Sequence, residues 1–138
     1  MIVKELMSEN PMTAQATAKV GEVVEMLLEV PFRHLPILEG RTLVGIVSDR
    51  DLRGLIHPRL PDARAIDDIK ARWSSPIASL MSGDPISVNP ETEVGEAVDL
   101  MLENAVGALP VVDASSGDLL GILSYVDVLR GVREAMDD

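Results

Sequence analysis

The sequence predicts an α+β fold made of two consecutive copies of one β-α-β-β-α unit. The chain repeats itself at a shift of 74 residues, with 12 identities in the 34 positions from 6 to 39, where ordinary composition gives about two or three. Each copy carries one amphipathic segment with apolar residues at i, i+3, i+4 and i+7, which indicates a helix with one buried face. Each copy then continues with two short apolar segments joined by a polar connection, which is typical of a β-hairpin.

In the first copy the helix is expected over Val20–Leu28, whose valines and leucines follow the helical spacing. The hairpin strands are expected over Leu35–Leu38 and Thr42–Val47, joined by a connection that contains a glycine. A closing helix then begins at Ser48, a residue type favoured at helix N-caps.

The second copy follows the same order. A short strand over Ile86–Val88 follows a proline turn, and the amphipathic helix covers Val94–Leu102. The hairpin strands cover Leu109–Val112 and Leu119–Leu123, and the closing helix begins at Ser124.

Between the copies we expect a linker over residues 57–75, so that the first motif covers 1–56 and the second 76–138. A short helix is expected within the linker, around Ala65–Arg72. A unit of about 50 residues is small for a core of its own. The apolar fraction of 46% is enough for a shared one, and we therefore expect the copies to pack face to face.

Composition excludes several functions. The absence of cysteine rules out disulfides and thiolate metal sites and suits the cytoplasm, where we expect the protein to be. No signal peptide and no apolar run of roughly 18 residues is present, so no membrane association is expected. The net charge of −11 argues against nucleic-acid binding. Ten of the 12 basic residues lie at or before Arg72, so the first half must supply most cationic contacts.

One short motif, Gly-x-x-Ser-x-x-Asp, occurs in both copies: Gly45, Ser48, Asp51 and Gly121, Ser124, Asp127. Two interpretations stay open. In a capping box, the serine oxygen accepts a backbone N–H one turn further, and the acid favours the positive end of the helix. In a ligand site, the serine contacts a phosphate and the aspartate accepts hydrogen bonds from both hydroxyls of a ribose.

The whole chain except the linker resembles a tandem pair of CBS domains, the unit named after cystathionine β-synthase. The resemblance rests on both Gly-x-x-Ser-x-x-Asp segments and on Leu6–Ser8 with Pro11, Leu80–Ser82 with Pro85, Leu35–Ile37, and Leu109–Asp113. It implies two motifs packed as a pseudo-twofold pair, and a homodimer of such pairs. It also implies that AMP, ADP, ATP or S-adenosylmethionine binds in two clefts between the motifs.

In this family each cleft is assembled crosswise, with serine and aspartate from one copy and the adenine contacts from the other. The resemblance implies that one cleft combines Ser124 and Asp127 with Met12, Phe32, Arg33 and His34. It implies that the other combines Ser48, Arg50 and Asp51 with Ile86, Val106, Gly107 and Ala108.

The two clefts are expected to differ in charge. Arg33 and His34 can face a phosphate in one cleft, whereas Gly107 and Ala108 stand at those positions in the other. Arg50 adds a cation there, where the second copy has Val126. We expect both clefts to bind, with unequal affinity.

The leading hypothesis is a regulatory module that senses an adenosyl ligand and reports to a separate effector protein. The alternative is a dimerisation scaffold with vestigial clefts, in which the motif only caps helices. We expect no enzyme, because the sequence has no phosphate-binding lysine loop and no nucleophile–base pair. No catalytic residue, resident cofactor or metal site is expected, and the two histidines are too isolated for zinc.

Overall fold

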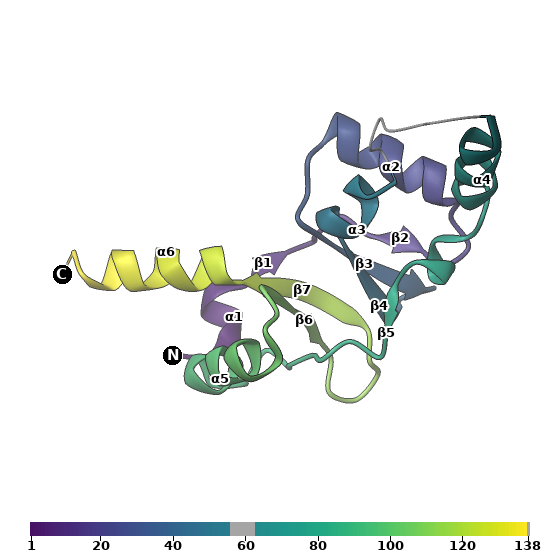
Figure 1. Cartoon of the computed structure of the whole chain (residues 1–138). Coiled ribbons are helices and arrows are strands. Elements are labelled where there is room, and N and C mark those ends of the chain that lie inside the picture. Colours follow the sequence, from purple (N-terminus) through teal and green to yellow (C-terminus); the bar gives the residue numbers. More distant parts are fainter. Residues whose placement is uncertain (56–62, 138) are drawn as a thin grey trace. The chain divides into compact units, whose positions relative to one another are not determined.

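The computed structural model describes residues 1–55 and 63–137, which form two compact units. Unit 1 comprises Met1–Pro11, Arg41–Leu43 and Pro85–Asp138, and unit 2 comprises Met12–Gly40 and Val44–Asp84. Figure 1 shows the helices and strands of each unit. Residues 57–62 of the expected linker, including His57, lie outside the described part of the chain.

Unit 2 is built around a sheet of four strands in the order β2-β3-β4-β5. Its elements along the chain are β2 (Ala14–Gln15), α2 (Val20–Glu29), β3 (His34–Glu39), β4 (Thr42–Ser48), α3 (Asp49–Arg53), α4 (Ala63–Trp73), a 3-10 turn (Ile77–Ser79) and β5 (Ser82–Gly83). Helix α4 packs against α2, where a Cβ added at Gly21 would lie 3.3 Å from the indole of Trp73. The short helix expected in the linker is confirmed and runs from residue 63 to 73.

Unit 1 contains a sheet of three strands in the order β1-β7-β6. Its elements are α1 (Val3–Leu6), β1 (Ser8–Glu9), α5 (Val94–Asn104), β6 (Ala108–Val112), β7 (Leu119–Ser124) and α6 (Tyr125–Ala135). The amphipathic helices, hairpin strands and closing helices expected from the sequence are confirmed in both units. No helix in the described ranges is long and apolar enough to cross a membrane.

The prediction of a strand over Ile86–Val88 is wrong. Of these residues only Val88 pairs, as a single parallel bridge to β6. Val88 donates its N–H to the Pro110 carbonyl and accepts from the Val112 N–H. A longer parallel ladder would need N–H donors at Pro110 on one side and at Pro90 on the other, and proline has none. In the first copy Ala16 stands where the second has Pro90, and its N–H bonds to the Leu38 carbonyl, which extends β2.

The two spatial units differ from the two sequence copies, because each unit includes a segment that begins the other copy. Strand β1 pairs antiparallel with β7, with Ser8 opposite Ile122. Strand β5 pairs antiparallel with β4 in the equivalent register, with Ser82 opposite Ile46. The chain has therefore exchanged its two Leu-Met-Ser segments between units.

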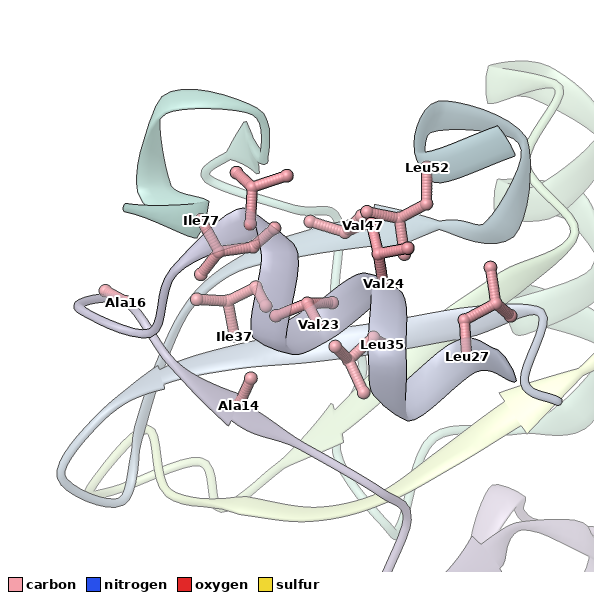
Figure 2. Packing of buried hydrophobic residues seen from close by; sticks show 11 residues of the cluster. Ala14, Ala16, Val23, Val24, Leu27, Leu35, Ile37, Val47, Leu52 and Ile77 are labelled. Carbon is pink, nitrogen blue, oxygen red and sulfur yellow. The ribbon is translucent and has the colours of Figure 1, made fainter. Parts of the chain in front are cut away.

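Each unit has its own aliphatic core, and each core includes a residue that stands three positions before the exchanged Leu-Met-Ser segment. In unit 2 one face of α2 packs onto β3 and β4, and Ile77 completes the cluster at 0% exposure (Figure 2). In unit 1 the apolar residues of α5, β6 and β7 pack around Val3, which is also 0% exposed. Val3 and Ile77 stand at equivalent positions of the repeat.

Candidate functional site

Both Gly-x-x-Ser-x-x-Asp segments fold as capping boxes at the start of a helix. In the first, Ser48 Oγ accepts a hydrogen bond from the backbone N–H of Asp51 at 3.2 Å, and Asp51 Oδ2 accepts one from the Ser48 N–H at 3.1 Å. In the second, the equivalent distances between Ser124 and Asp127 are 3.1 and 2.9 Å. The capping interpretation of the motif is confirmed in both copies.

A capping box of this kind leaves part of each side chain available for a ligand. The serine oxygen accepts the backbone hydrogen bond, so its own proton can still be donated to a phosphate oxygen. The aspartate directs one oxygen to the serine N–H, and its other oxygen can accept hydrogen bonds from ribose hydroxyls. Capping and ligand binding are therefore compatible at the same two residues.

The glycines of the motif make room for the exchanged strands. A Cβ added at Gly121 would lie 2.7 Å from the backbone oxygen of Ser8 and 3.1 Å from Met7 Sδ. At Gly45 it would lie 3.0 Å from the backbone oxygen of Ser82. Close strand packing thus explains both glycines without a ligand.

At the first motif, Asp51 and Arg50 are both exposed at the start of α3. The Asp49 N–H donates to the Arg33 carbonyl at 2.9 Å, which brings the segment before Leu-Pro beside the motif of its own copy. Burial lowers the pKa of His34 below its ordinary value, the Asp49 carboxylate opposes this, and the Arg33 guanidinium adds to it. His34 therefore adds little positive charge at neutral pH, and the exposed arginines carry the charge.

The second motif is apolar where the first is basic. The Tyr125 N–H donates to the Gly107 carbonyl at 3.0 Å, and Ala108 lies opposite Ser124 in the β6–β7 ladder. Val106, Gly107 and Tyr125 line an apolar groove of about 610 Å³ together with residues of α5 and α6. Here too, the segment before Leu-Pro lies beside the motif of its own copy.

The remaining expected contact residues lie at the borders of these elements. Met12 precedes β2 and is 36% exposed, Phe32 packs partly buried against the core of unit 2, and Ile86 is 37% exposed before Val88. The two crosswise sets combine residues of both units and stay a prediction. In the parts of the chain that the structure describes, no group of three or more histidine or acidic side chains could hold a metal ion.

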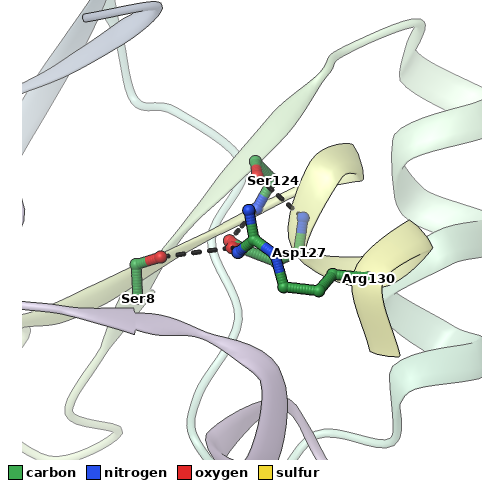
Figure 3. Close-up of polar contacts among 4 residues, drawn as sticks. All are labelled: Ser8, Ser124, Asp127 and Arg130. Carbon is green, nitrogen blue, oxygen red and sulfur yellow. Dashed lines mark hydrogen bonds and ion pairs between the residues drawn. The ribbon is translucent and has the colours of Figure 1, made fainter. Parts of the chain in front are cut away.

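Asp127 has further partners that Asp51 does not share (Figure 3). Ser8 Oγ donates to Asp127 Oδ1 at 3.2 Å, and Arg130 Nη1 lies 3.7 Å from the same oxygen. Sequence reasoning missed both partners. The recurrence of Leu-Met-Ser could have pointed to Ser8, whereas Arg130 has no basic counterpart, because Gly54 stands at its position in the first copy.

The chain is similar to proteins that contain CBS domains. It is 30% identical over 131 residues to a CBS domain-containing protein of Dictyostelium discoideum, covering 94% of this chain and 89% of that one. It is 31% identical over 125 residues to a homoserine O-acetyltransferase of Methanocorpusculum labreanum, covering 90% of this chain but only 23% of the transferase.

Among solved structures, the chain is similar to CBSX2 in complex with AMP, with a TM-score of 0.81, 30% identity and 98% of each chain covered. It spans 58% of the length of the CBSX2 protein of Arabidopsis thaliana. The family model of the CBS domain matches residues 3–58 and again residues 77–134. Two tandem matches over most of the chain, each ending in a capped Ser–Asp motif, mean that this protein belongs to the CBS domain family.

Proposed function

We propose that the chain is a regulatory module that binds an adenine nucleotide at its Gly-x-x-Ser-x-x-Asp motifs and catalyses no reaction. The observation that carries this proposal is the capping box that both motifs form. In each, the capping box orients a serine hydroxyl that can donate to a phosphate and an aspartate that can accept from a ribose. The AMP complex of CBSX2, a solved structure of the same fold, supports AMP as the first ligand to test.

The first motif has the chemistry that a nucleotide monophosphate needs. Asp51 is exposed and can accept from the ribose diol, while Arg50 beside it supplies positive charge for the phosphate. ADP, ATP and S-adenosylmethionine share the adenosine part and differ beyond the ribose, so they are tested beside AMP.

Isothermal titration calorimetry of the purified protein with AMP tests the proposal. Asp51→Asn removes a charged acceptor, and we expect it to weaken AMP binding by about ten- to a hundredfold. Glu39→Gln is a matched control, because Glu39 is an exposed acid at the end of β3, and it should keep wild-type affinity. The proposal fails if none of the four adenosyl ligands binds and if neither Asp51→Asn nor Asp127→Asn alters any thermal shift.

A homodimer is the second part of the proposal. The groove beside α5 and α6 exposes Leu102 by 74%, Leu129 by 62% and Tyr125 by 42%. Large apolar side chains gathered in one groove favour a protein partner. A second copy of the chain would cover this groove with its own α5–α6 surface. Sedimentation velocity should show a dimer, and Leu129→Glu should shift it towards the monomer.

The same experiments separate the sensor from a scaffold. A sensor responds to its ligand because the ligand binds two states with different affinity, so AMP should alter the stability of the dimer. A dimer whose stability does not respond to any adenosyl ligand would instead favour the scaffold. A separate effector protein and a cytoplasmic location complete the proposal, the latter supported by the absence of cysteine.

A further inference from the structure

The two motifs have the same sequence pattern but differ in what their aspartates contact. We propose that Ser8 closes the second motif: its hydroxyl occupies Oδ1 of Asp127, and an adenosyl ligand must displace it before a ribose can bind there. This inference rests on the proposed function, since it concerns access to one of the two proposed sites.

Both oxygens of the Asp127 carboxylate are in contact with groups of the chain itself. Its side chain is 7% exposed, and it is the one buried polar residue found among the described residues. Oδ2 accepts from the Ser124 N–H at 2.9 Å, while Oδ1 accepts from Ser8 Oγ at 3.2 Å and faces Arg130 Nη1 at 3.7 Å (Figure 3). A ribose hydroxyl would donate to Oδ1 in the same way as the Ser8 hydroxyl. Because Asp127 is buried and Arg130 also lies beside this oxygen, the two hydroxyls compete for the same position.

The first motif provides the internal comparison. Asp51 is exposed, and within residues 1–55 and 63–137 no donor reaches its Oδ1. Ser82, the repeat counterpart of Ser8, lies in the same register of β5 and is exposed like Ser8, but it makes no side-chain bond to Asp51 in that part of the chain. Gly54 replaces Arg130. The first motif is therefore open and the second closed, although both have the same capping box.

Closure links the second motif to the N-terminal segment. Ser8 lies in β1, which pairs with β7 immediately before Ser124. A ligand that displaces the Ser8 hydroxyl removes a side-chain bond that holds β1, and by reciprocity a loosened β1 raises the affinity for the ligand. The second motif thus senses the state of the N-terminal segment, whereas the first does not.

The test uses Asp51→Asn as the background, so that AMP binding reports mainly the second motif. Ser8→Ala is added to this variant, and Ser82→Ala is added separately as the matched control from the first copy. Losing one competing hydrogen bond should tighten AMP binding by about two- to tenfold in the Ser8→Ala protein. The Ser82→Ala protein should bind like the background, as measured by calorimetry.

Hydrogen exchange adds a measurement that needs no Ser8 variant. In the Asp51→Asn protein, saturating AMP should raise amide exchange in residues 7–9, because the ribose releases Ser8. Equal affinity of the Ser8→Ala and Ser82→Ala proteins, or unchanged exchange in residues 7–9, would overturn the closure while leaving nucleotide binding intact. If the wild-type protein and all variants bind neither AMP nor any of the other three adenosyl ligands, the proposed function itself fails, and the closure with it.

Discussion

Gly121 lies where the exchanged strand β1 crosses β7 at close range. The carbonyl oxygen of Ser8 and the sulfur of Met7 both lie within the space that a side chain at this position would need. The neighbouring backbone oxygen belongs to a paired strand and has little room to move. Packing therefore requires glycine at the first position of the motif, whereas the serine and the aspartate provide its hydrogen-bonding groups.

Replacing Gly121 by alanine should destabilise the protein by about 1–3 kcal/mol, because overpacking forces the paired strands apart. Gly95→Ala is the control, since a Cβ there meets no neighbour and lies in helix α5. That control should stabilise the protein by up to about 1 kcal/mol. Urea unfolding measures both changes, and equal effects of the two substitutions would contradict this account of the motif.

His34 should make stability depend on pH. Burial holds its folded pKa below the ordinary value of 6.5. As the pH falls below 6.5, the unfolded chain therefore binds the proton first, and the free energy of unfolding decreases. Urea unfolding between pH 7.5 and 5 should show a steeper loss for the wild type than for His34→Asn, and parallel curves would refute this role.

At the scale of elements, the helices of both copies and their caps follow local rules. The serine caps and the amphipathic helices depend on residues within one or two turns, so their positions could be predicted closely. The strand before α5 could not, because its pairing depends on donors that Pro110 and Pro90 lack. The order of apolar residues in one segment does not show whether the neighbouring strand has the N–H donors that pairing needs.

Helix α5 ends at Asn104, and its C-cap, Ala105, adopts the left-handed conformation with φ 53° and ψ 42°. Alanine is strained there, because its Cβ approaches the following carbonyl, and glycine is not. Ala105→Gly should raise the free energy of unfolding by about 0.5–1 kcal/mol, after the larger entropy of the unfolded glycine chain is counted.

Ala71→Gly is the control for this substitution. It exchanges the same residues in the last turn of α4, where the alanine is exposed, and should lower stability by up to about 1 kcal/mol. Thermal unfolding distinguishes the two. Losses of similar size would mean that backbone entropy alone decides both.

At the scale of the whole molecule, the exchanged segments make each unit depend on residues far away in the sequence. Val3 completes the core of unit 1, and Ile77 completes that of unit 2, each at 0% exposure. Removing either side chain should weaken the unit in which it packs and not the copy in which it stands.

Val3→Ala should destabilise unit 1 by about 1.5–3 kcal/mol and raise amide hydrogen exchange in β6 and β7. Ile77→Ala should destabilise unit 2 by about 2–5 kcal/mol and raise exchange in β3 and β4 instead. Mass spectrometry of peptide fragments locates the change. Raised exchange in β3 and β4 after Val3→Ala would contradict the exchange of segments.

The sequence by itself determined the duplication, the order of helices and strands and the two capped motifs, because these depend on spacing and on neighbours within a few residues. Only the tertiary structure decided where Leu6–Ser8 and Leu80–Ser82 pair. These segments are identical, and local pattern favours neither sheet for either one. That long-range pairing places Ser8 on Asp127, whereas Asp51 is exposed. Two motifs with the same Gly-x-x-Ser-x-x-Asp pattern therefore differ in access.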